Sequence, residues 1–236
     1  MLEHIIKYGQ KTINFSLVRE LRKTLKISVL PDLSVEVSVP YELSPEKILS
    51  KVKGRAPWIT KQIDYFKMFL PKETPRQYIS GETHYYFGRQ YRLKVVQATF
   101  QEVKLKGKYI FIYSLQPDNK THTKVLLYKW YKFRAKEMFK MITERSNDKI
   151  KKYGIKVPHV EIKIMKSRWG SCMHSKMKIG LNIELIKAPS HCIEYVIIHE
   201  MCHFKYPNHT KQFYNFLSLV LPDWEKRKAR LERVVI

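Results

Sequence analysis

The stretch VIIHEMCHFKYPNHTKQF, residues 196–213, constrains the fold of this chain more than any other part of the sequence. It places two histidines, His199 and His203, four positions apart, directly after an apolar run. On an α-helix of about 3.6 residues per turn, this spacing puts both imidazoles on one face, one turn apart. The apolar residues indicate a helix packed in the interior, where unpartnered imidazoles would be costly to bury. The sequence therefore predicts a buried helix whose two histidines share one ion.

Two further residues complete the predicted site. Glu200 follows the first histidine and gives the H-E-x-x-H pattern, in which two histidines bind zinc and the glutamate acts as general base. A catalytic zinc needs a third protein ligand and one position for water. Pro207 cannot continue the helix, and Asn208 is a favourable N-cap for a second helix, so His209 can fold back toward the first pair. Residues 210–222 contain no acid, which makes His209 the predicted third ligand.

A competing interpretation of the same residues contains no metal. In it, His199 and His203 are core histidines bonded to carbonyl groups, and His209 only decorates the start of a helix. The H-E-x-x-H pattern does occur in proteins that bind no metal. This interpretation leaves Glu200 beside the histidines without a cation, and we therefore favour the metal site.

The first half of the chain has mainly strand patterns. Alternating apolar and polar residues in TLKISVL and LSVEVSVP predict an antiparallel hairpin. Ser44 as N-cap and Pro45 at the first helical position begin a helical region, which Gly54 and Pro57 divide into two short helices. Strand patterns return between residues 77 and 113. This half is predicted to be β-rich with a helical insertion.

The second half has mainly helix patterns. A long amphipathic segment from about residue 125 to 152 predicts a helix of several turns. The segments VEIKIMKSRWGSC and KMKIGLNIELI predict two strands. Pro189 and Ser190 introduce the site helix, and a second helix follows from about Asn208 and ends at Pro222. The sequence thus predicts an α+β fold with a β-rich region over residues 1–120 and a compact domain over residues 121–236.

The charge balance bears on possible partners. The chain has 45 Lys and Arg against 21 Asp and Glu, a formal net charge of +24, which favours association with polyanions such as nucleic acid or nucleotides. Basic and aromatic residues are interleaved in YKWYKFRAKEMFK. On a helix, however, Trp130, Phe133 and Phe139 are predicted to face the core, with the lysines in solvent. The charge alone therefore does not define a binding surface.

Composition also indicates where the protein resides. No stretch approaches the ~20 consecutive apolar residues of a membrane helix, and the start MLEHIIKYGQK lacks a signal-peptide pattern. Three cysteines, Cys172, Cys192 and Cys202, form an odd count without repeated spacing, so no disulfide framework is implied. We expect a cytoplasmic protein that does not associate with membranes. The sequence does not predict its oligomeric state.

Several sequence blocks follow one another in a characteristic order. In the C-terminal half they are SRWGSC (167–172), GLNIELI (180–186), YVIIHEMCH (195–203), NHTKQF (208–213) and LPDW (221–224). These blocks and their order resemble the YgjP-like metallopeptidases, which are compact zincins related to the Wss1-like and SprT-like proteases. The N-terminal half resembles the family more loosely, in APWITKQ and ISGETHYYFGRQYRLKV.

The resemblance implies a zincin-like metallopeptidase domain in the C-terminal region. Carried over residue by residue, it makes His199, His203 and His209 the zinc ligands and Glu200 the catalytic base, the same residues that the spacing indicates. It also implies that the strand pair before the site helix lies at the cleft, where an extended substrate adds as another strand.

The role of the SRWGSC block stays open. Arg168 could stabilise a developing oxyanion, or Trp169 and Gly170 could shape a tight turn, which is the interpretation we favour. Cys172 could approach the metal as an inhibitory thiolate, but a small buried side chain is the preferred interpretation. Cys202 is predicted to point away from the histidine face of its helix.

Three functional hypotheses follow. The leading one is zinc-dependent hydrolysis of a peptide or protein substrate with Glu200 as general base, for which Tyr206 and Tyr214 are candidate oxyanion donors. The second keeps the metal and makes the chain a nucleoside triphosphate pyrophosphatase, although no G-x-x-x-x-G-K loop and no carboxylate cluster for magnesium is present. The third is a DNA-associated protease that acts on nucleic-acid-bound proteins, a role that resembles that of the Wss1-like and SprT-like relatives.

Overall fold

The chain divides into two compact units, Met1–Glu73 and Thr74–Ile236. This division differs from the predicted boundary between residues 120 and 121, because the strands before that boundary pack on the helix that follows it. Each unit is described by itself. The structure, a computed structural model, describes residues 3–30, 32–67, 76–165 and 168–233.

The first unit is a four-stranded sheet followed by two helices. The strand order is β1-β2-β4-β3, and the antiparallel pairing of β3 with β4 confirms the predicted hairpin. The break between the helices at Gly54 confirms the predicted division of the helical region. Alternate strand residues such as Phe15 and Val37 pack against Ile48 and Ile59 of the helices. The elements are β1 (Glu3–Tyr8), β2 (Lys11–Arg19), β3 (Lys26–Val29), β4 (Val35–Val39), α1 (Pro45–Gly54) and α2 (Ala56–Lys67).

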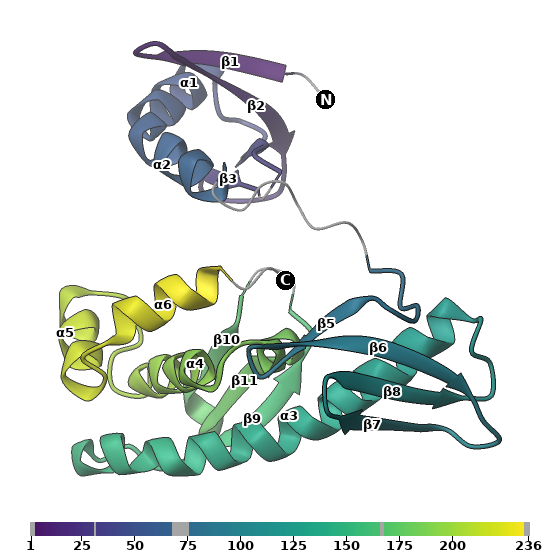
Figure 1. Cartoon of the computed structure of the whole chain (residues 1–236). Coiled ribbons are helices and arrows are strands. Elements are labelled where there is room, and N and C mark those ends of the chain that lie inside the picture. The colour runs from purple at the N-terminus through teal and green to yellow at the C-terminus, as the bar shows by residue number, and fades with distance from the viewer. Residues whose placement is uncertain (1–2, 31, 68–75, 166–167, 234–236) are drawn as a thin grey trace. The chain divides into compact units, whose positions relative to one another are not determined.

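The second unit combines two sheets with one long helix and three shorter ones along its described residues. The elements are β5 (Thr83–Tyr86), β6 (Arg89–Gln97), β7 (Glu102–Lys106), β8 (Tyr109–Ser114), α3 (Lys120–Ile150), β9 (His159–Lys163), β10 (Gly170–Met173), β11 (Lys178–Asn182), η3 (Ile183–Lys187), α4 (Ser190–Cys202), α5 (Lys211–Val220) and α6 (Trp224–Glu232). Figure 1 shows α3 running along this unit, with β6, β7 and β8 beside its N-terminal half and α4 with β9 to β11 beside its C-terminal half.

The helix α3 confirms the predicted long amphipathic helix and corrects one detail of it. Phe139 is fully buried and Trp130 packs against the core, as predicted. Phe133, by contrast, is 59% exposed, because it lies on the same outer face as Lys129 and Lys136, four positions before and three after it. Along the described residues, no helix is both long enough and apolar enough to cross a membrane.

The sheet that packs against α4 has the strand order β10-β11-β9. The prediction of one strand over VEIKIMKSRWGSC is wrong. β9 and β10 pair with opposite edges of β11, the first parallel and the second antiparallel, and the chain must leave the sheet between them. Residues 166–167 of this connection lie outside the described residues. The predicted strand KMKIGLNIELI is also too long, because β11 ends at Asn182 and the short helix η3 follows it.

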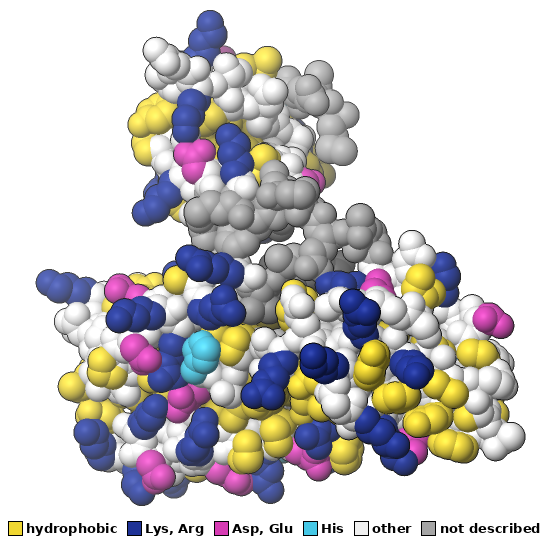
Figure 2. Space-filling model, in the orientation of Figure 1, with side chains coloured by type: hydrophobic (Ala, Val, Ile, Leu, Met, Phe, Trp, Pro, Cys, Tyr) yellow, Lys and Arg dark blue, Asp and Glu magenta, His cyan; other side chains and the backbone are white. Residues whose placement is uncertain are grey.

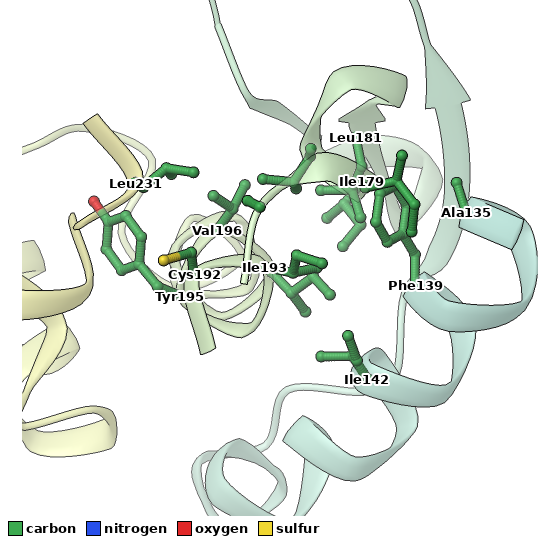
Figure 3. Close-up of a cluster of buried hydrophobic side chains, with 14 of the residues drawn as sticks. Ala135, Phe139, Ile142, Ile179, Leu181, Cys192, Ile193, Tyr195, Val196 and Leu231 are labelled. Atoms are coloured by element: carbon green, nitrogen blue, oxygen red, sulfur yellow. The ribbon is translucent and has the colours of Figure 1, made fainter. Parts of the chain in front are cut away.

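The helix α4 is buried on nearly all sides, as its apolar sequence predicts. Figure 3 shows it between α3 and α6, with Ile193 toward Phe139 and Ile142 of α3, and with Tyr195 on the side of Leu231. A helix packed on several faces holds its side chains in fixed rotamers. This packing gives the residues of the H-E-x-x-H motif a rigid base.

The hairpin turn between β5 and β6 is hydrogen-bonded to η3, the segment that precedes α4. Phe87 and Gly88 have positive φ angles of 51° and 77°, as a two-residue type I′ turn requires. Their N–H groups donate to the carbonyl oxygens of Ile186 and Lys187, each at 2.9 Å. A Cβ on Gly88 would lie 2.9 Å from Cα of Pro189, so glycine is needed for this close approach.

A buried carboxylate connects α4 to both neighbouring helices. Glu194 Oε1 accepts a hydrogen bond from Lys149 Nζ of α3 at 2.8 Å, and Oε2 pairs with the Arg227 guanidinium of α6. Burial alone would raise the pKa of Glu194, but the hydrogen bonds from the two cations outweigh burial and hold that pKa below its usual range. The two ion pairs of Glu194 therefore stabilise the fold only while its carboxylate is charged.

We expect Glu194→Gln to lower the free energy of unfolding by about 2–3 kcal/mol at pH 7, since two cations lose their charged partner. The pKa of Glu194 is lower in the folded protein than in the unfolded chain. The stabilisation from its ion pairs is therefore complete above the unfolded-state pKa of about 4.3, and it is lost as the pH falls through the lower pKa of the folded protein. Urea unfolding of the parent and of Glu194→Gln at neutral and acid pH measures the difference in the free energy of unfolding. The exposed Glu225→Gln on α6 is the matched control. A parent–Glu194→Gln difference that persists at acid pH would contradict the assignment.

Candidate metal centre

The structure brings the three predicted histidines together. His199 lies in the last turn of α4, His203 is its C-cap residue, and His209 lies in the turn before α5. One nitrogen from each can be chosen so that all lie within 4.8 Å of one another. Nε2 of His199 and Nε2 of His209 are 2.9 Å apart. The three imidazoles thus face one common point.

The position of His209 differs slightly from the prediction. The N-cap of α5 is Thr210 rather than Asn208, so His209 precedes the helix instead of starting it. The turn after Pro207 is longer than predicted, because the Asn208 carbonyl accepts the Thr210 N–H at 2.8 Å. His209 consequently sits on a loop that folds back over α4, which is how it reaches His199.

The protonation of the histidines suits a metal. Burial first, and then the neighbouring histidines His203 and His209, lower the pKa of His199 to about 3. Burial and His203 also lower the pKa of His209. The Nδ1 of His203 lies 3.1 Å from the Tyr206 carbonyl and can donate to it, which leaves Nε2 with its lone pair free. Neutral imidazoles with free lone pairs are the form that binds metal.

The donor set fits a divalent cation. Two Nε2 atoms at 2.9 Å can share no more than one proton, and the buried Nδ1 of His199 has no hydrogen-bond partner within the described ranges. A group of three imidazole nitrogens is a common set for zinc. A cation shared by His199, His203 and His209 would take the place of the one proton that the facing Nε2 atoms of His199 and His209 can share.

One aromatic side chain supports all three histidines. Phe213 of α5 is fully buried, and its ring centroid lies 4.9 Å from the ring of His199, 4.6 Å from that of His203 and 4.8 Å from that of His209. Its contacts fix the orientation of the imidazoles. The H-E-x-x-H pattern does not predict this role of Phe213. The available signal was its position four residues after His209, at the start of an apolar helix face.

Glu200 is buried beside the histidines, 7% exposed. Burial raises the pKa of Glu200 to about 7, and the positive charge of Arg168 opposes this increase. A pKa near neutrality suits a group that both accepts and returns a proton. Glu200 directly follows His199 on α4, and its side chain lies against Gly170 of β10.

The SRWGSC block has a role that differs from the favoured prediction. Gly170 is not in a tight turn; it begins β10. A Cβ on Gly170 would lie 2.6 Å from Oε1 and 2.7 Å from Cγ of Glu200. Glycine therefore lets β10 pass directly against the Glu200 side chain. Ser167, the first residue of the block, lies outside the described residues.

Gly170→Ala is expected to lower kcat for peptide cleavage by about 10²-fold, because the added methyl group must displace the Glu200 carboxylate by a fraction of an ångström or more. Metal content should not change, since no histidine is touched. Steady-state kinetics and elemental analysis measure the two quantities. Gly54→Ala in α1, where a Cβ would meet nothing within 4 Å, is the control. A Gly170→Ala enzyme with parental kcat would contradict this positioning role.

Asn182 holds the segment that leads into β10. Its buried Nδ2 donates to the carbonyl of Met165 at 2.9 Å and to that of Arg168 at 3.1 Å. Its N–H donates to the Trp169 carbonyl at 2.8 Å. These bonds fix the backbone just before Gly170, and so they help to place β10 against Glu200. The sequence pattern of GLNIELI does not predict this role of Asn182.

The remaining predicted residues are placed as follows. Cys172 is half-buried, and burial together with the charge of Glu200 raises its pKa to about 11, so it is a neutral thiol. Cys202 is fully buried and is not one of the three grouped ligands. The Tyr206 ring packs on Phe216, at 5.5 Å between centroids. The Tyr214 ring stacks beside His209, at 6.0 Å, and is partly exposed at the site.

The chain matches the family model described as "YgjP-like, metallopeptidase domain" over residues 23–234. It belongs to the YgjP-like family. Membership confirms the resemblance seen in the sequence, makes the protein a metallopeptidase by family and implies a divalent metal. No curated protein matches the chain.

Two solved structures show limited similarity. One is the metallopeptidase zymogen abylysin of Pyrococcus abyssi, 18% identical, with a TM-score of 0.36 over 39% of this chain and 90% of that chain. The other is the metallopeptidase zymogen jannalysin of Methanocaldococcus jannaschii, 24% identical, with a TM-score of 0.35 over 40% of this chain and 90% of that chain.

Proposed function

We propose that this YgjP-like protein is a zinc peptidase whose ion is held by His199, His203 and His209 and whose general base is Glu200. The observation that carries the proposal is the convergence of three imidazoles, two of them at the C-terminal end of the helix that carries one buried carboxylate. A bound zinc ion would lower the pKa of a water molecule and polarise a peptide carbonyl. The family supports the peptidase class, and the residues above supply the mechanism.

Glu200 moves the proton in this mechanism. Its carboxylate accepts a proton from the attacking water and then delivers that proton to the leaving amine nitrogen. A cation bound beside it would favour the charged form that the first step needs. Gly170 and the buried position of the side chain hold the carboxylate in place between the two steps.

Tyr214 and Arg168 are candidates to contact a substrate carbonyl oxygen. The partly exposed Tyr214 ring stacks beside His209, and the positive charge of the exposed Arg168 acts to lower the pKa of Glu200. β10 forms one edge of its three-stranded sheet, and an extended peptide could pair with that edge. A peptide bound there would pass directly in front of Glu200.

The proposal is tested by offering the purified full-length protein an unfolded, fluorescently labelled polypeptide. We expect peptides to be released, release to stop when a chelator removes the metal, and release to return when zinc is added. Nucleoside triphosphates are tested in parallel, because a net charge of +24 also favours anionic substrates. Zinc-dependent hydrolysis of triphosphates without peptide cleavage would replace the proposal with the pyrophosphatase alternative.

A further inference from the structure

The sheet β5-β6-β8-β7 has one buried and one open face. Along β8, Ile110 and Ile112 are fully buried and pack in the core with α3. The alternate residues Tyr109, Phe111 and Tyr113 therefore point to the opposite face. Tyr109 is 42% exposed. A central strand thus presents three aromatic rings in a row on the side of the sheet that α3 does not cover.

The rings are regularly spaced along the strand. The centroids of Tyr109 and Phe111 are 5.9 Å apart, and those of Phe111 and Tyr113 are 6.2 Å apart. Phe100 continues the row, 5.3 Å from Tyr113, and is 52% exposed. Bases in a duplex lie only about 3.4 Å apart along each strand. Rings at nearly twice this spacing suit bases that are splayed apart, as they are in a single strand.

Cations flank the row on both sides. In the strand register, Arg92 and Lys94 of β6 lie opposite Tyr109 and Phe111, and Lys106 and Lys104 of β7 lie opposite the same two rings. These four cations are all exposed. Lys94 Nζ is 5.3 Å from the Phe111 centroid. Figure 2 shows hydrophobic and basic side chains interspersed over the region of β6, β7 and β8.

Negative charge on this face is small. The β7 residue opposite Tyr113 is Glu102, and its carboxylate is paired with Lys104 at 2.6 Å. The surface that we call the aromatic-basic face consists of Tyr109, Phe111, Tyr113 and Phe100, with the flanking cations Arg92, Lys94, Lys104 and Lys106.

We propose that the aromatic-basic face binds single-stranded nucleic acid, with bases stacked on the rings and phosphates on the cations. Sheets that bind single strands combine these two features, because every base has a π-face and every nucleotide carries a negative charge. An acidic peptide would engage the cations but not the row of rings. A duplex would engage the cations but keep its bases stacked away from the rings. This inference does not depend on the metal centre.

The test measures fluorescence anisotropy of labelled oligonucleotides of about 12 nucleotides, single-stranded DNA, single-stranded RNA and duplex DNA, with the full-length protein over a range of salt. We expect a single strand to bind more tightly than the duplex. Phe111→Leu, which removes the π-face and keeps apolar volume, should weaken binding about tenfold. The double variant Lys94→Gln/Lys106→Gln should make the plot of log binding constant against log salt concentration less steep by about 1.4. Each lost phosphate contact of a single strand contributes about 0.7 to that slope.

Matched controls come from the exposed side of α3. Phe133→Leu removes an exposed aromatic ring outside the aromatic-basic face, and Lys132→Gln/Lys136→Gln removes the same charge. Both controls should bind the single strand as the parent does. Equal losses in the control and sheet variants, preferred binding of duplex, binding only to anionic lipid vesicles, or no binding at low salt would each overturn the proposal. If Phe111→Leu does not fold, the more exposed Tyr109→Leu takes its place.

Discussion

Replacing Glu200 with glutamine is expected to lower kcat for peptide cleavage by about 10²–10⁴-fold, because an amide cannot accept the proton of the attacking water. Glutamine has nearly the same shape as glutamate, so the close contact with Gly170 is kept. Metal content should therefore equal that of the parent. Steady-state kinetics, elemental analysis and circular dichroism measure activity, metal and fold in the same preparation.

The control for Glu200→Gln is Glu225→Gln, which removes one exposed carboxylate from α6. It should leave kcat unchanged. Parental activity in Glu200→Gln would show that another group accepts the proton. Loss of metal in Glu200→Gln would show instead that this carboxylate holds the ion, and that outcome would also contradict its role as general base.

The second large effect is expected for Phe213→Ala. The ring of Phe213 is fully buried and contacts all three histidines. Its truncation should lower the free energy of unfolding by about 3–5 kcal/mol, measured by urea unfolding with a chelator present. Zinc affinity should fall as well, because the imidazoles lose the surface that orients them. Competition with a zinc-binding dye measures that affinity.

Phe216→Ala separates packing from metal binding. Phe216 lies on the same helix and is nearly as buried, but its ring contacts are with Tyr153 and Tyr206 rather than with the histidines. It should cost similar stability and leave zinc affinity close to the parental value. Equal zinc affinities in Phe213→Ala and Phe216→Ala would contradict the orienting role of Phe213.

Local patterns in the sequence were sufficient to predict that three histidines lie together. The four-residue spacing of His199 and His203 specifies one helix face, and Pro207 specifies a turn that returns His209 toward it. Both arguments depend on short stretches of chain. The same reasoning predicted the hairpin of β3 with β4 and the long helix α3, because apolar periodicity is a local property.

Contacts between distant segments could not be predicted in this way. Gly170 and Glu200 meet only because β10 pairs with β11 and the sheet packs on α4. Sequence patterns gave Gly170 as a turn residue, since glycine is common in turns. The link from Glu194 to Lys149 and Arg227 joins three helices and has no local signal either. Each of these features depends on tertiary packing.

The position of the unit boundary has the same physical explanation. The strand patterns of β5 to β8 look like those of the first unit, and composition gives no reason to separate them. Their inward residues, such as Leu93 and Ile110, pack in the same core as Leu127 and Tyr131 of α3. Membership in a unit is decided by that shared core, which the strand pattern alone does not specify.

The most direct test of the metal centre is the zinc content of purified protein after dialysis with excess zinc. It is measured by elemental analysis on the parent, on His199→Ala, His203→Ala and His209→Ala, and on the control His122→Ala at the start of α3. We predict about one zinc per chain in the parent and the control, and a large loss in each of the three variants. A parent that stays empty, or variants that keep full zinc, would contradict the three-histidine centre.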